Sequence, residues 1–124
     1  MACPLFLPVP QPDDPYSGIC AADPGVPVPA PILRSCCRRG YARGACERAG
    51  HAEADAVRFL IKSDSDGEVV VAWAREHDHH PLAVGVASAL SPGTGDETLD
   101  AQISAYAASY IRHRERTSYF PAQK

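Results

Sequence analysis

The first 33 residues carry no positively charged side chain. No Lys or Arg precedes Arg34, and Pro4, Pro8, Pro10 and Pro12 interrupt every apolar run near the start. A signal peptide needs a basic start and roughly 7–15 uninterrupted apolar residues, and a membrane-spanning helix needs about 20. The sequence therefore predicts neither, and we expect a cytoplasmic protein that does not engage membranes.

Familiar motifs of catalysis and nucleotide binding are also missing. The chain has no G-x-G-x-x-G, P-loop, G-x-S-x-G or H-E-x-x-H motif, so no reaction class is indicated and the question of enzymatic activity stays open. It also lacks the C-x2–4-C knuckle with which most zinc modules supply two ligands. The formal net charge of −3 argues against general binding to nucleic acid.

Proline and cysteine are abundant, and both are confined to one region. The chain of 124 residues has 12 prolines and five cysteines, and the usual proline content is only about 5%. Nine prolines fall within residues 1–31 and all five cysteines within 3–46. We therefore expect a single domain in two parts: a Pro/Cys-rich, metal-binding arm over residues 1–50 and a folded unit over 51–124.

Within the arm, the prolines exclude a helix or a central strand before residue 31, because they remove backbone donors and fix φ. We expect an extended, polyproline-like segment there. Pro31 suits the first position of a short helix that ends at Gly40. A further helical turn is expected over residues 45–52.

The five cysteines follow the spacing C-x16-C-x15-C-C-x8-C, as Cys3, Cys20, Cys36, Cys37 and Cys46. Cytosolic thiols are kept reduced, and an odd count argues against full disulfide pairing. Four thiolates can hold one zinc ion or one [4Fe–4S] cluster.

Because neighbouring residues on a helix point about 100° apart, only one of the adjacent pair is expected to be a ligand. Cys37 lies nearer the turn at Gly40, so we expect the ligands to be Cys3, Cys20, Cys37 and Cys46. Their sulfurs should converge to within about 4–7 Å, and Cys36 should point away.

The choice between a cluster and zinc is open from the residues alone. The scattered ligands and the proline that follows Cys3 favour [4Fe–4S] slightly. A regulatory disulfide and inert packing of the thiols are the alternatives without metal. A second set of possible ligands, His77-Asp78-His79-His80, precedes Pro81 and is interpreted as a turn.

In the second part, alternation of apolar residues predicts strands over Val57–Lys62, Glu68–His77 and Leu82–Leu90. Asp64–Gly67 is a turn signal that joins the first two strands. A helix is expected from about Asp96 to Arg116.

The start of that helix has a capping-box spacing at Thr94 and Glu97. Its apolar stripe consists of Leu99, Ile103, Tyr106, Tyr110 and Ile111. The fold class is thus α+β: a three-stranded antiparallel sheet packed on a C-terminal helix, with the Pro/Cys-rich arm pinned by a cysteine cluster.

Three segments together carry a resemblance: Cys3-Pro4-Leu5-Phe6, Gly18-Ile19-Cys20 and the run from Leu33 to Cys46. They resemble a group of small uncharacterised bacterial proteins with a scattered four-cysteine pattern and a Leu-Arg-x-Cys-Cys core. The similarity covers mainly residues 1–61. It implies that the cysteines act together, and it brings no established activity.

These observations lead to one functional hypothesis and three alternatives. We expect a small protein that binds a [4Fe–4S] cluster through four cysteines, with a structural or electron-transfer role. The first alternative is a structural zinc protein that uses the same four ligands. The second is a metal-free interaction module whose Pro-rich arm docks a protein partner. The third is a cysteine-dependent redox enzyme.

Overall fold

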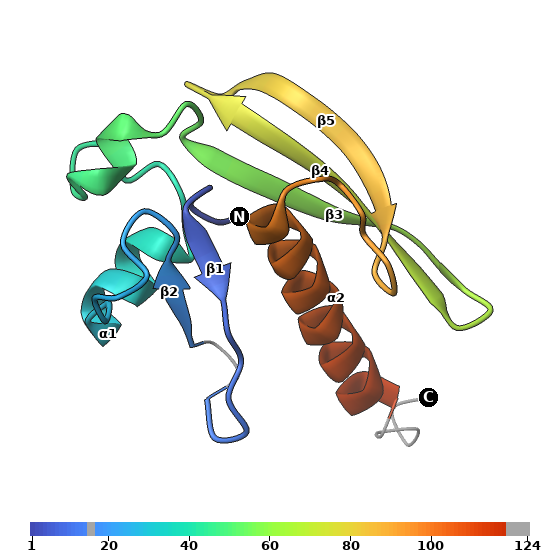
Figure 1. Ribbon diagram of the computed structural model, residues 1–124. Helices are drawn as coiled ribbons and strands as arrows, with labels where there is room; N and C mark the ends of the chain where they lie inside the picture. Colours follow the sequence, from blue (N-terminus) through green and yellow to red (C-terminus); the bar gives the residue numbers. More distant parts are fainter. Residues whose placement is uncertain (15–16, 119–124) are drawn as a thin grey trace.

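The computed structural model describes residues 1–14 and 17–118 and has the α+β architecture that the sequence predicts (Figure 1). Strands β3 (Ala56–Ser65), β4 (Glu68–His77) and β5 (His80–Ser88) form an antiparallel sheet in the order β3-β4-β5. Helix α2 (Glu97–Ser118) packs against one face of this sheet. No helix in the described part of the chain combines the length and apolar character needed to cross a membrane.

Two-residue turns join the three strands. Asp66 and Gly67 (φ 54° and 76°) form the first turn, and Asp78 and His79 (φ 49° and 65°) form the second. Positive φ at both central positions matches the right-handed twist of the paired strands. The second turn is so short that β5 begins at His80, two residues before the sequence predicts.

The core between the sheet and α2 consists of buried aliphatic side chains with aromatic side chains packed against them, and large residues are placed against small ones. Trp73 on β4 pairs with Gly85 on β5, and a Cβ at Gly85 would lie only 2.7 Å from the Trp73 ring. Glycine is therefore required there by packing. The buried members of the core are Val57, Val69, Val71, Ala87, Leu99, Ile103 and Ala107.

Asp96, the residue directly before α2, caps the helix, whereas the sequence predicts a capping box at Thr94 and Glu97. The backbone amides of Thr98 and Leu99 donate to Asp96 Oδ1 at 2.9 and 3.1 Å. Thr94, expected to form a capping box, instead donates its hydroxyl hydrogen to Asp100 Oδ1. Asp96 takes the capping role because its short carboxylate directly precedes the first turn.

The proline-rich arm is extended, as predicted, and it also forms a small sheet of its own. Strands β1 (Phe6–Pro8) and β2 (Gly18–Cys20) pair antiparallel. β1 lies beside the first half of α2 (Figure 1). An isolated bridge between Ala2 and Val57 joins the arm to β3.

The expected arm helix is present but irregular. Helix α1 (Ala30–Ile32) continues into a π-helical turn, η1 (Leu33–Cys37). Gly40 follows with φ 77°, the left-handed conformation expected there. The helical turn expected over 45–52 is the 3-10 helix η2 (Arg48–His51).

Candidate metal centre

All five cysteines border one small cavity within the arm. Cys3 precedes β1, Cys20 ends β2, Cys36 and Cys37 lie on η1, and Cys46 precedes η2. Every one is a free thiol, and all except the half-buried Cys46 are buried. The structure therefore brings the four predicted ligands together from segments as much as 43 residues apart in sequence.

Backbone pairing brings Cys3 and Cys20 to this cavity. Cys20 is opposite Phe6 in the β1–β2 ladder, and the Cys3 amide donates to the Cys37 carbonyl at 2.9 Å. Gln102 on α2 completes the arrangement. Its buried Nε2 donates to the carbonyls of Cys3 and Phe6 at 2.8 and 2.7 Å, which fastens the first cysteine to the helix.

The π-helical turn brings both members of the adjacent pair to the cavity. The Arg38 amide donates to the Leu33 carbonyl at 3.1 Å, an i→i+5 hydrogen bond. Such a turn winds less per residue than an α-helix, so Cys36 and Cys37 diverge less than the sequence analysis assumed. Cys36, expected to point away, borders the same cavity.

Cys46 is held by the loop that carries it, and Arg48 adds a cation beside the cavity. The Cys46 amide donates to the Ala42 carbonyl at 2.7 Å. Arg48 borders the cavity, and a hydrogen bond with Cys20 is the largest cause of the raised pKa of its guanidinium. Arg48 also forms an ion pair with Asp23 at 3.4 Å. A thiolate at Cys20 would therefore have a hydrogen-bond donor beside it.

Burial raises the pKa of two of the thiols. Desolvation, followed by the neighbouring cysteines, raises the pKa of Cys37 to about 11. The pKa of Cys3 is also raised, again chiefly by burial. Because metals bind thiolates, loading this site would release protons.

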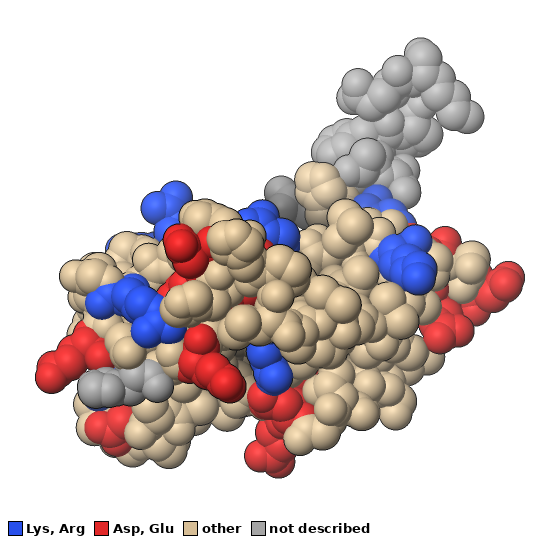
Figure 2. Space-filling model, turned by 90° about the horizontal axis from the view of Figure 1, so that it is seen from above, with Lys and Arg blue, Asp and Glu red and all other residues tan. Residues whose placement is uncertain are grey.

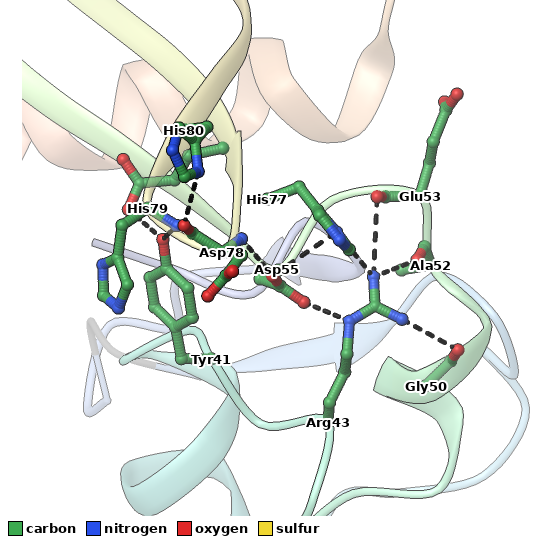
Figure 3. A network of polar contacts seen from close by, with 11 residues as sticks. Tyr41, Arg43, Gly50, Ala52, Glu53, Asp55, His77, Asp78, His79 and His80 are labelled. Atoms are coloured by element: carbon green, nitrogen blue, oxygen red, sulfur yellow. Dashed lines mark hydrogen bonds and ion pairs between the residues drawn. The ribbon is translucent and has the colours of Figure 1, made fainter.

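A polar network fixes the segment that precedes Cys46 to the sheet (Figure 3). The Arg43 guanidinium forms an ion pair with the buried Asp55 and donates to the carbonyls of Gly50 and Ala52 at 3.0 and 2.7 Å. Asp55 also accepts a 2.6 Å hydrogen bond from the Asp78 amide. These contacts lower the pKa of Asp55, with the Asp78 amide as the largest cause. The loop around η2 is therefore closed by one arginine.

Tyr41 forms the second half of this network. Its hydroxyl donates to Glu76 and accepts a 2.9 Å hydrogen bond from the His79 amide. Arg58 binds the same carboxylate through two nitrogens, at 3.1 and 3.0 Å. Arg58 and then Tyr41 are the main causes of the lowered pKa of Glu76. The residues between η1 and Cys46 are thus anchored to the turn between β4 and β5.

The turn between β4 and β5 contains or borders the three histidines that the sequence suggests as a second set of ligands, His77, His79 and His80. His77 Nδ1 lies 3.5 Å from Asp55 Oδ2, while the His79 ring stacks on Tyr41 with centroids 4.4 Å apart. His80 Nδ1 lies 2.8 Å from the Asp78 carbonyl oxygen. Each ring has a different neighbour (Figure 3), in keeping with a turn rather than a metal site.

The cysteine cavity itself is small. Its volume is about 20 Å³, close to the minimum for one water molecule. Within residues 1–14 and 17–118, no three Cys, His, Asp or Glu side chains are grouped as ligands of a single metal ion. Loading of the site would therefore require the cysteine side chains to change position.

Comparisons with models of protein families, with curated proteins and with solved structures found no match for this chain.

Three supporting residues escaped the sequence analysis: Tyr41, Arg43 and Gln102. Gln102 carried a usable signal, because it lies three residues after Leu99, on the face of α2 that is otherwise apolar. A buried polar side chain on such a face needs a hydrogen-bond partner. Tyr41 and Arg43 carried no comparable signal, since their partners on the sheet are distant in sequence.

Proposed function

We propose that this protein binds a [4Fe–4S] cluster through Cys3, Cys20, Cys37 and Cys46, in a structural or electron-transfer role. One observation carries the proposal: the fold gathers every cysteine of the chain around one buried cavity. Inert thiols that only fill space have no reason to converge from four separate segments. When bound, a cluster would supply one-electron chemistry and would cross-link the arm.

The surroundings of the cavity suit an anionic centre. A cluster with four thiolates carries net negative charge, and Arg48 stands beside Cys20. Hydrogen bonds to cluster sulfurs and nearby cations are the means by which proteins adjust cluster potentials. The half-buried Cys46 places one edge of the site close to the surface, where electrons could enter or leave.

A structural zinc site with the same ligands is the second candidate. The small volume of the cavity favours it, because one ion needs less room than a cluster. Zinc draws its four sulfurs to about 2.3 Å from one centre, so the thiols would have to move inward rather than outward.

Anaerobic purification of the full chain distinguishes these candidates. We expect a brown protein with visible absorption and about four iron and four sulfide ions per chain. Cys20→Ser should abolish the colour. Cys36→Ser is the matched control, because Cys36 borders the same cavity and should leave the cluster in place.

Other results would count against the cluster. A colourless protein that retains one zinc ion per chain would support the second candidate. A fully folded protein without metal, after reconstitution with iron and sulfide and after incubation with zinc, would contradict both and favour the metal-free interaction module.

A further inference from the structure

A second cavity lies where the arm meets helix α2 and strand β3. Its volume is about 160 Å³, and an engineered apolar cavity of about 150 Å³ is large enough to hold one benzene molecule. Among the described residues, only Phe6 borders both this cavity and the cysteine cavity. The two cavities are therefore distinct sites.

The walls of the second cavity are largely apolar, and three of its lining side chains are aromatic. Phe6 comes from β1, Phe59 from β3 and Tyr106 from α2. The rings of Phe59 and Tyr106 stack with their centroids 5.3 Å apart. Aromatic walls favour a ligand with a flat apolar body, and the volume limits that body to the size of a single ring.

One side of α2 supplies the polar part of the wall. Gln102, Ala105, Ser109 and Arg112 line the cavity at spacings of three and four residues, so they lie along the same side of the helix. Gln102 is buried, and its Oε1 has no hydrogen-bond partner among the described residues. A buried acceptor without a partner is uncommon in proteins, and a donor held in the cavity would satisfy it.

The charged side chains of the lining are both arginines, and none of the described lining residues is acidic. Arg38, which follows η1, is half-buried, and Arg112 on α2 is exposed. Within residues 1–14 and 17–118, Arg112 has no ion-pair partner, whereas five other arginines each have one. Because guanidinium groups bind carboxylates through paired hydrogen bonds, this lining favours an anionic ligand.

We propose that this cavity binds a small aromatic carboxylate, with its ring against the aromatic wall and its carboxylate held by Arg38 and Arg112. The overall charge does not draw anions to the protein, since the formal net charge is −3. On the face of the molecule that Figure 2 shows, basic side chains are interspersed with acidic ones. Recognition depends instead on two guanidinium groups beside an apolar wall, which suits a ligand with one negative charge and one ring.

Titration of the full chain with sodium benzoate at constant ionic strength, followed by amide NMR spectra, tests the proposal. We expect saturable shifts of the amides of β1 and residues 102–112, with a Kd of about 1 mM or tighter. Benzamide, the neutral analogue, should bind at least about tenfold more weakly, because it cannot form the charge-assisted hydrogen bonds. Acetate, which lacks the ring, should be weaker by a similar factor.

Substitutions in the lining test where the ligand binds. Arg38→Gln and Arg112→Gln should each weaken benzoate binding at least about tenfold. Arg39→Gln is the matched control, because Arg39 is next to Arg38 but does not line the cavity. Ala105→Leu should abolish binding by filling the cavity, whereas Ala108→Leu, at an exposed position of the same helix, should leave it unchanged.

Several results would overturn the proposal. One is the absence of saturable shifts at benzoate concentrations well above the expected Kd. Equal affinities for benzoate and benzamide would show that the arginines do not recognise the carboxylate, and binding that survives Ala105→Leu would place the ligand elsewhere. Cyclohexanecarboxylate tests the preference for a flat ring, which is wrong if this acid binds as tightly as benzoate.

Discussion

The thiol of Cys37 shows how its surroundings alter the chemistry of one residue. It is buried beside four other cysteines, and its pKa is raised to about 11. A thiolate at Cys37 would lose its hydration and would be repelled by any other thiolate nearby. In the metal-free site the thiols of Cys3 and Cys37 are therefore protonated near neutral pH, and a metal would have to displace their protons.

This pKa predicts that the metal-free protein loses stability at alkaline pH. The native state holds the Cys37 proton more tightly than the unfolded chain, whose thiol titrates near pH 9. The resulting contribution is fully present below pH 9 and is lost as the pH rises through about 11, on the order of 2 kcal/mol.

Denaturant unfolding of reduced, metal-free protein at pH 8 to 11.5 measures this loss. Cys37→Ser should remove that part of the pH dependence, because serine does not titrate there. If the free energy of unfolding depends on pH in the same way in the parent and the variant, Cys37 titrates like an exposed thiol and the prediction is wrong.

At the scale of elements, the start of α2 depends on one carboxylate. Asp96 accepts hydrogen bonds from two amides of the first turn and forms an ion pair with Arg75 on β4. It therefore caps the helix and joins it to the sheet. The capping hydrogen bonds contribute more than the ion pair, because both partners of the pair are partly exposed to solvent.

Asp96→Ala should lower the free energy of unfolding by about 1 kcal/mol, within a range of roughly 0.5–2 kcal/mol. Asp96→Asn separates the two roles, since asparagine caps helices nearly as well but carries no charge. Urea denaturation should show a much smaller loss for Asp96→Asn. Equal losses for both variants would mean that the ion pair, and not the cap, is the main contribution.

At the scale of the whole molecule, the sheet–helix unit and the arm are each stabilised by different kinds of interaction. The sheet and α2 share a core of aliphatic side chains. The described residues of the arm, 1–14 and 17–50, have small apolar clusters built largely around cysteines, supported by Gln102, Tyr41 and Arg43. Order in the arm should therefore depend on the cysteine site more than order in the sheet does.

Cys46→Ser should consequently loosen the arm and leave the rest folded. We expect faster hydrogen exchange in residues 17–50, with protection retained in 57–75 and 99–111. Cys36→Ser is the control and should change neither region. Unchanged protection of the arm in Cys46→Ser would mean that the polar contacts are sufficient, whereas loss of all protection would mean that the site nucleates the entire fold.

Much of the architecture could be predicted because its signals are local. Alternating apolar residues identify β3 and β4, and the apolar stripe from Leu99 to Ile111 identifies α2. The irregular features could not be predicted in this way. The π-helical turn at Leu33–Cys37 depends on hydrogen bonds that simple periodicity does not distinguish from those of an α-helix.

The sequence by itself determined the α+β class, the extended proline-rich arm and the set of thiols available for a site. Each follows from properties that a residue carries with it: the fixed φ of proline, the alternation of side chains along a strand, and the chemistry of sulfur. The tertiary structure alone decided that all five cysteines meet at one cavity and that Cys36 borders it with Cys37. These outcomes depend on contacts between segments distant in sequence, such as Gln102 with Cys3 and Tyr41 with Glu76, which no local pattern specifies.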